Sequence, residues 1–146
     1  MKLSKDSRFV NAIADEVARK HPDKLVETLA YRYSEPAPKK IRPRPNVRVR
    51  LALSGVCEAH PFGQCRPNDH PAGLLKAWSR VTDQMYVWHY MTNFHQTLEP
   101  HPNLDELSAN IGYYRRHGVT GLFLQGAYSK GGGGELAELR SYLCAR

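Results

Sequence analysis

Four short apolar stretches, separated mostly by helical patterns, constrain the fold of this chain more than any other feature. They are rich in β-branched and aromatic residues, as buried strands are, and cover residues 25–33, 47–53, 84–90 and 119–124. Amphipathic patterns of helical period cover residues 4–20, 71–81, 104–117 and 135–144. The order is helix, strand, strand, helix, strand, helix, strand, helix, which predicts parallel strands joined by right-handed crossovers.

Local signals support the limits of these elements. Ser4 can cap the first helix, and Gly118 follows the third at the position that favours glycine. The Pro-rich residues 34–46 predict a loop. We expect one face of the first helix to pack against the sheet, and its apolar residues are Phe9, Val10, Ile13, Val17 and, at the margin, Ala14.

Polar and aromatic residues follow all four strands, and this favours one kind of α/β fold. In a (β/α)8 barrel the loops after the strands converge on one face, where active sites lie. A doubly wound sheet would instead carry a Gly-rich phosphate turn after its first strand, and this chain has none there. The glycine run at 131–134 lacks the Lys-Ser/Thr pair of a phosphate-binding loop. We therefore predict a partial (β/α)8 barrel of about four parallel strands with flanking helices.

The length of the chain bears on its domain organisation. A sequence of 146 residues matches one domain, so we assign residues 1–146 to a single partial barrel. Four strands form only half of a barrel, which leaves two unpaired strand edges and one uncovered apolar face. We therefore expect the chain to be a fragment of a longer protein, or to complete itself by self-association through its open edges.

The net charge of +7 raises the question of a nucleic-acid partner. Much of the positive charge lies in residues 39–50, which carry no nucleic-acid motif. We interpret this segment as a solvated loop leading into a strand and expect no nucleic-acid partner. No apolar run is long enough to span a bilayer, so we expect no membrane contact, and the first residues lack the apolar core of a signal peptide. These features leave the localisation open.

The side chains at the strand ends suit a carbohydrate ligand. Flat aromatic rings stack on the C–H faces of sugar rings, while amides bind hydroxyl groups. For Tyr31 and Trp88 a plain packing role is an equally good interpretation, and Asn93 and Gln125 can instead cap loops. We expect substrate contacts from Tyr31, His60, Trp88, His89, Tyr90, Asn93, Gln125 and Tyr128.

Three cysteines leave several alternatives open. The pattern Cys57-x2-His60-x4-Cys65-x4-His70 offers four zinc ligands in one loop, although the spacing is not that of a standard zinc finger. A disulfide between Cys57 and Cys65 is a second alternative, which requires an oxidising compartment, and two free thiols are the third. Cys144 lies in a helical pattern and is expected in the core. We assign no metal and no cofactor.

Several sequence blocks, taken together and in order, resemble one bacterial family. The longest are residues 88–94, 118–126 and 134–143, and the shorter ones are 29–31, 42–47, 59–61, 102–104 and 110–111. The family is the domain of unknown function 4838 (DUF4838), part of which is classed as glycoside hydrolase family 163. The similarity covers nearly the whole chain.

The resemblance implies a (β/α)8-type catalytic domain with endo-β-N-acetylglucosaminidase activity on N-glycans, in which the N-acetyl group of the substrate acts as nucleophile. It also implies a longer parent protein that is exported or on the cell surface. The reaction needs an acid for the leaving oxygen and a polar group that orients the acetamide. Glu135 is the first candidate for the acid/base and Glu58 the second, while Tyr31 can orient the acetamide. As alternatives, Glu135 can be a carboxylate favoured by a helix N-terminus, and Glu58 a solvated loop residue.

Two positions depart from the family pattern, since members often carry acidic residues where this chain has Gly55 and His89. If either acid is required, this copy is altered or inactive, and we expect the chain alone to catalyse no reaction. Two function classes follow. One is a glycosidase domain, or a fragment of one, that acts on glycans containing N-acetylglucosamine. The other is a non-catalytic carbohydrate-binding or structural remnant of such a barrel.

Overall fold

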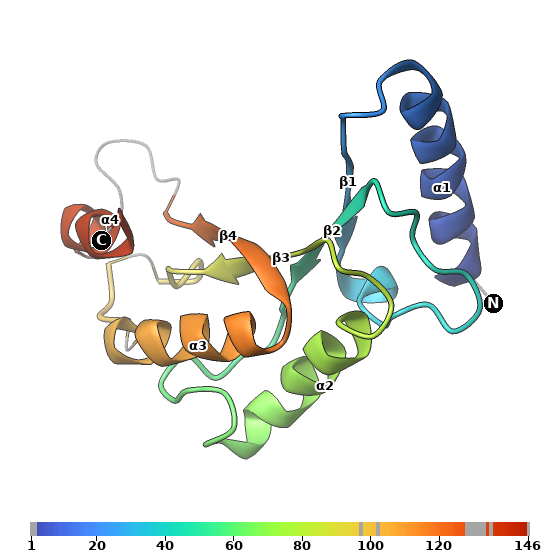
Figure 1. Ribbon diagram of the computed structural model, residues 1–146. Helices are drawn as coiled ribbons and strands as arrows, with labels where there is room; N and C mark the ends of the chain where they lie inside the picture. Colours follow the sequence, from blue (N-terminus) through green and yellow to red (C-terminus); the bar gives the residue numbers. More distant parts are fainter. Residues whose placement is uncertain (1–2, 97, 102, 128–133, 135, 146) are drawn as a thin grey trace.

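The computed structural model describes residues 3–96, 98–101, 103–127, 134 and 136–145, and it has the predicted order of elements. All four strands are parallel and form one sheet, which confirms the predicted α/β class. The elements, shown in Figure 1, are α1 (Leu3–Lys20), β1 (Val26–Ala30), the 3-10 turn η1 (Arg32–Ser34), β2 (Val47–Ala52), the 3-10 turn η2 (Arg66–Asn68), α2 (Asp69–Trp78), β3 (Met85–Tyr90), α3 (Leu104–Arg116), β4 (Val119–Gln125) and α4 (Ala137–Ala145).

The limits of the elements differ from the expected ones by a few residues. The first strand ends at Ala30, three residues early, because Arg32 has a φ of 50° and starts the turn η1. The helix α2 begins at Asp69 rather than Pro71, which places Pro71 in its first turn, where a missing N–H costs no hydrogen bond. Gly118 has a φ of 79° after α3, as its predicted position requires.

The strands follow one another across the sheet in the order β1-β2-β3-β4. This sequential order is that of consecutive units of a (β/α) barrel, whereas a doubly wound sheet reverses its order at a switch point. The strands β1 and β2 are joined by a Pro-rich loop without a helix, and α2 and α3 form the next two crossovers. The fold is therefore that of a partial (β/α) barrel, in which all carboxyl ends of the strands lie at one edge of the sheet.

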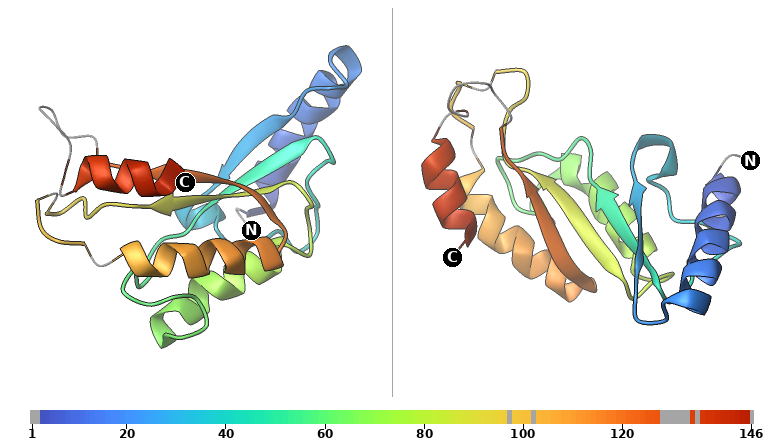
Figure 2. Two further views of the ribbon diagram at one scale, coloured as in Figure 1. Left: turned by 60° about the vertical axis from the view of Figure 1, so that its left-hand side comes forward. Right: turned by 90° about the horizontal axis from the view of Figure 1, so that it is seen from above.

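The helices α1, α2 and α3 pack on one face of the sheet, and the hydrophobic core lies between these helices and the sheet. Alternate strand residues point to this face, with Val49, Leu51, Met85 and Val87 fully buried. They contact Leu75 and other side chains of α1, α2 and α3. Figure 2 shows the ribbons of these three helices against the sheet. The residues in between, on the open face of the sheet, are half-buried or exposed, and they are Glu27, Leu29, Arg48, Arg50, Tyr86, Trp88, Tyr90 and Phe123.

The buried face of α1 differs from the expected one. Phe9 is 67% exposed and Ile13 is 40% exposed, whereas Asn11 and Ala14 are buried. Hydrogen bonds of Asn11 explain this difference. Its side-chain Nδ2 donates to the Arg42 carbonyl at 2.9 Å, and its Oδ1 accepts from the backbone N–H of Arg44 at 3.0 Å. These bonds satisfy backbone groups of the Pro-rich loop, which has no regular partners of its own. They turn Asn11 inward and Phe9 outward.

The basic segment divides between the loop and the sheet. Arg44 pairs with Asp15 of α1 at 2.8 Å, while Arg50 pairs with Glu27 of the neighbouring strand at 2.8 Å. The Arg48 guanidinium lies over the Tyr86 ring at 4.2 Å. Three of the six basic residues in segment 39–50 therefore lie against carboxylates or an aromatic ring. Among the helices of the described ranges, none combines the length and the apolar character that a membrane crossing needs.

Candidate functional site

An open cavity of about 820 Å³ lies at the carboxyl ends of β1, β2 and β3. The loops that follow these three strands form its walls. Tyr31 comes from the loop after β1, Glu58 from the loop after β2, and Tyr90 and Asn93 from the end of β3 and its loop. Four residues that the sequence suggested for a site are therefore brought together around one space.

Glu58 pairs with His101, another residue of the cavity wall, through a close contact between its Oε2 and the imidazole Nε2. Each side chain is 17% exposed. Burial raises the pKa of the Glu58 carboxyl above its ordinary value, and His101 opposes this effect. Arg140 of α4 holds the His101 loop by donating to the His101 carbonyl at 2.8 Å. The pair thus places a carboxyl group whose pKa lies above its ordinary value at the cavity wall.

Tyr31 and Tyr90 form an aromatic part of the wall. Arg32 lies over the Tyr31 ring at 5.2 Å, and Phe94 meets the Tyr90 ring edge-on with centroids 5.8 Å apart. Burial raises the pKa of Tyr90, and the neighbouring Tyr31 raises it further. Both residues are only half-buried and line the cavity, so part of each side chain is open to a ligand. Aromatic faces beside hydroxyl donors suit the apolar faces and hydroxyl groups of a sugar.

Asn93 has a structural task as well as a place in the cavity wall. Its Oδ1 accepts from the His95 amide at 3.0 Å and from the Gln96 amide at 3.3 Å. This turn fixes the loop after β3, as the alternative interpretation of Asn93 expected. A ligand can therefore use the NH2 group of Asn93, because the carbonyl oxygen already caps the turn.

Trp88 lies on the open face of the sheet and does not line the cavity. Its ring packs against Phe123 with centroids 4.3 Å apart, and the Arg50 guanidinium is 6.0 Å from it. It lies two residues before Tyr90 on the same strand face, with ring centroids 6.3 Å apart. Trp88 thus packs beside Tyr90 without lining the cavity, as the packing interpretation expected.

His89 points to the opposite face of the sheet, beneath α3, and is only 2% exposed. Its Nδ1 lies 3.0 Å from the Tyr114 hydroxyl. Its Nε2 lies 3.4 Å from Glu106 Oε1, within ion-pair distance but without hydrogen-bond geometry. Successive residues of a strand point to opposite faces, so His89 cannot share the cavity with Tyr90. The structure gives His89 a packing environment, and the expected substrate contact does not agree with this position.

The remaining expected substrate contacts do not line the cavity or fall outside the described residues. Gln125 is opposite Tyr90 in the strand register, and its amide donates to the Gly126 carbonyl at 3.1 Å. His60 is exposed beside the cavity loop but does not line the cavity. Glu135, the first candidate for the acid, and Tyr128 fall outside the described residues.

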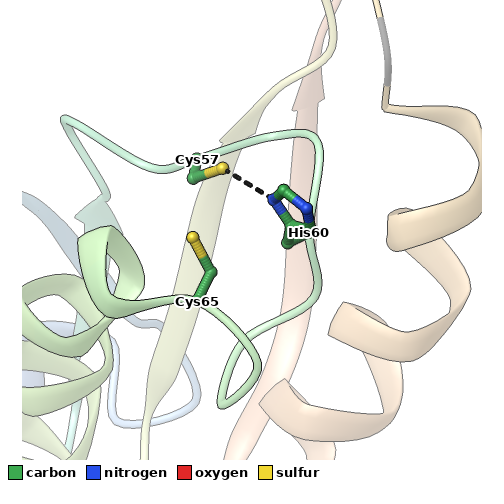
Figure 3. Close-up of side chains that lie close together, drawn as sticks. All are labelled: Cys57, His60 and Cys65. Carbon is green, nitrogen blue, oxygen red and sulfur yellow. Dashed lines mark hydrogen bonds between the residues drawn. The ribbon is translucent and has the colours of Figure 1, made fainter.

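His60 instead belongs to a cluster with Cys57 and Cys65, shown in Figure 3. The Cys57 Sγ and the His60 Nδ1 are 3.3 Å apart, and the three potential ligand atoms lie within 4.8 Å of one another. His60 lowers the pKa of the Cys57 thiol, whereas burial and the Cys57 neighbour raise that of Cys65. Both cysteines are free thiols, and His70 is not part of the cluster.

Sequence reasoning missed His101. It lies in the loop before α3, 43 residues after Glu58, and no strand ends beside it. The one local signal is its position between Pro100 and Pro102, which indicates a rigid loop but names no partner. Its contact with Glu58 depends on how the loops after β2 and β3 fold against each other.

Comparisons with known proteins add one finding. A scan against protein-family models matches residues 6–146 to "Domain of unknown function (DUF4838)". A search of curated proteins found no match, and neither did a search of solved structures. The match covers nearly the whole chain and agrees with the family that the sequence blocks resemble.

Proposed function

This chain belongs to the DUF4838 family, and from that premise we propose that its cavity binds a glycan containing N-acetylglucosamine, with Glu58 as the acid/base of a glycoside hydrolysis. The observation that carries the proposal is the convergence of a carboxyl group, two tyrosines and an amide on one cavity from three different loops. Its volume of about 820 Å³ suits a short oligosaccharide. The link to hydrolysis rests on the resemblance to glycoside hydrolase family 163.

The chemistry assigns a role to each wall. A carboxylic acid protonates the oxygen of the leaving sugar, and we assign this role to the Glu58 carboxyl at the cavity wall. Conventional glycosidases use two carboxylates, but among the described residues that line the cavity Glu58 is the one carboxylate. A single carboxylate is enough if the N-acetyl group of the substrate attacks the anomeric carbon. Tyr31 or Asn93 can then bind and orient the acetamide, while the ring of Tyr90 stacks on the sugar.

A non-catalytic carbohydrate-binding role is the second candidate. The observation that favours it is Gly55, which lines the cavity at a position where the family resemblance implies a carboxylate. Its φ of 70° favours glycine over a residue with a side chain. In this case the tyrosines would hold the glycan and Glu58 would serve only as a hydrogen-bond acceptor.

Binding is tested by saturation-transfer NMR with N,N′-diacetylchitobiose, and with cellobiose as the analogue without acetamides. We expect the acetamide-containing sugar to bind more tightly. The variants Tyr31→Ala and Tyr90→Ala should each lose about 1 kcal/mol, or about fivefold in affinity, because each removes one aromatic contact. Tyr33→Ala is the matched control, since Tyr33 is 70% exposed on the same turn as Tyr31 but does not line the cavity.

Turnover is tested by the release of a core glycan from a glycoprotein with the longer parent protein that the family resemblance implies, because we expect the chain alone to catalyse no reaction. If the proposal holds, Glu58→Gln keeps chitobiose binding and abolishes release, because the amide retains the shape but cannot donate the proton. Binding without release by the unaltered protein would instead establish the non-catalytic role. Equal binding of both sugars by all variants, or no binding at all, would remove the carbohydrate proposal.

A further inference from the structure

Three potential metal ligands converge in the loop after β2, which also carries Glu58. Figure 3 shows the side chains of Cys57, His60 and Cys65 turned toward one another. A tetrahedral zinc site with ordinary Zn–S and Zn–N distances places its ligand atoms about 3.6–3.8 Å apart. The three atoms here lie within 4.8 Å of one another, and the Cys57 Sγ and His60 Nδ1 are 3.3 Å apart. A shift of about 1 Å or less in the side chains therefore gives ligand geometry.

The backbone that carries these ligands is held by a buried side chain. Asn68 is 0% exposed, and its Oδ1 accepts from the Cys57 amide at 2.7 Å. Its Nδ2 donates to the Cys57 carbonyl at 3.1 Å and to the His60 carbonyl at 2.9 Å. The backbone N–H of Asn68 in turn donates to the Cys65 carbonyl at 2.9 Å. One residue thus fixes the positions of all three potential ligands.

A second anchor lies between the ligands in the sequence. Phe62 is buried against the rings of Tyr113 and Tyr114, with centroids 5.3 Å and 5.5 Å away. Its amide donates to Asn110 Oδ1 at 2.8 Å, and Gly63 with a φ of 85° then turns the chain back toward Cys65. The loop is therefore ordered by protein contacts before any ion binds. Pre-organisation of this kind reduces the conformational entropy lost on binding.

We propose that Cys57, His60 and Cys65 bind one thiophilic divalent cation of the zinc type, with the fourth tetrahedral position taken by water or another small ligand. Binding releases two protons from the two thiols to solvent, and the two thiolates neutralise the charge of the ion. The imidazole binds through Nδ1 and keeps its proton on Nε2. The ion would fix the loop that also carries Glu58, one residue after Cys57.

The geometry favours a cation over the disulfide alternative. A disulfide would use the two sulfur atoms and leave the imidazole without a role, although His60 contacts the Cys57 sulfur directly. Two thiols and an imidazole are a common donor set for zinc. The exposed His60 ring also leaves a path for an ion to enter from solvent.

The test is a titration of the reduced, metal-free protein with Co²⁺, which reports thiolate ligation by a near-ultraviolet charge-transfer band and tetrahedral geometry by its visible bands. We expect one equivalent to bind and Zn²⁺ to displace it. Cys57→Ser, Cys65→Ser and His60→Ala should each weaken binding at least about tenfold. Cys144→Ser is the matched control for loss of a thiol, and His70→Ala is the control for a nearby imidazole; both should bind as the unaltered protein does.

Two spectroscopic results would overturn the proposal. One is a reduced, folded protein that shows no thiolate-to-cobalt band. The other is a band that persists in both Cys57→Ser and Cys65→Ser. If a variant fails to fold by circular dichroism, the stoichiometry and spectrum of the unaltered protein decide. Recovery of a Cys57–Cys65 disulfide from reduced protein held with Zn²⁺ in air would likewise count against the site, since bound zinc protects thiolates from oxidation.

Discussion

At the scale of single residues, polar side chains are buried where α3 packs on the sheet. His89, Glu106 and Tyr114 are each at most 2% exposed, and His89 contacts both of the others. Asn110 donates to Glu106 and accepts from the Phe62 amide at 2.8 Å, which links this group to the loop after β2. Buried polar groups cost stability unless they are paired, so the hydrogen bonds of Asn110 and the contact of Tyr114 with His89 favour one arrangement of α3 on the sheet. His89 Nε2 and Glu106 Oε1 are buried without a hydrogen-bond partner among the described residues, which costs part of this stability.

Tyr114 is expected to make the stability of the folded protein depend on pH. Burial raises the pKa of Tyr114 above its ordinary value of 10.0, and Glu106 and Glu58 raise it further. Above pH 10 the unfolded chain therefore releases this proton while the folded protein keeps it. The stability that Tyr114 contributes is fully present below pH 10 and falls as pH rises, by about 1.4 kcal/mol per pH unit.

Urea unfolding between about pH 8 and about pH 11 measures this effect. Tyr114→Phe should be less stable than the unaltered protein near pH 8 by about 1 kcal/mol, because the contact with His89 is lost. The difference should shrink and then reverse as pH rises above 10. Tyr113→Phe, a change at the adjacent residue whose ring stacks on His117, should keep the pH dependence of the unaltered protein. A constant difference between Tyr114→Phe and the unaltered protein at all pH values would contradict the assignment.

At the scale of elements, the contact between β3 and β4 depends on a glycine. Gly121 is paired with Tyr86 in the strand register, and a Cβ at Gly121 would overlap the Tyr86 ring. The ring in turn lies under the Arg48 guanidinium of β2, at 4.2 Å. Three adjacent strands are thus packed together on the open face through one aromatic ring that needs a glycine beside it.

We therefore predict that Gly121→Ala destabilises the protein by about 2 kcal/mol, because Tyr86 must leave its position or the strands must separate. Chemical denaturation measures the change. Gly126→Ala is the matched control, since a Cβ there meets no atom within 4 Å and the change in unfolded-chain entropy is the same. Equal effects of the two substitutions would show that the Tyr86 contact has no energetic consequence.

At the scale of the whole molecule, the described sheet ends in two edge strands, β1 and β4, and one of its faces carries no described helix. Leu29 on β1 is 45% exposed and Phe123 on β4 is 37% exposed, both on this open face. Exposed edges with apolar side chains are the surfaces through which sheets associate. Self-association through these edges, which we expect from the sequence, stays a prediction, and Leu29 and Phe123 are the residues expected at the contact.

Sedimentation velocity over a range of micromolar concentrations tests this prediction. We expect concentration-dependent association that Leu29→Lys weakens at least about tenfold, because a lysine on an edge strand opposes pairing. Phe9→Lys is the control on the exposed side of α1, where Phe9 is 67% exposed. Association that responds to Phe9→Lys and not to Leu29→Lys would place the contact on α1 instead.

The sequence by itself determined the order of the elements, the parallel sheet and the family, because these follow from local patterns. Period-two and period-3.6 apolar patterns are short-range properties, and residues after parallel strands share one edge of the sheet. This is why Tyr31, Glu58 and Tyr90 could be expected near one another before their positions were known.

Only the tertiary structure decided which side of each strand faces the cavity and which distant groups meet. His89 and Tyr90 are adjacent in the chain, yet one is buried beneath α3 and the other lines the cavity. The choice between them depends on which face the helices cover. The contact of Glu58 with His101 likewise joins loops 43 residues apart. Such pairings depend on packing across the whole fold, and local sequence patterns carry no information about them.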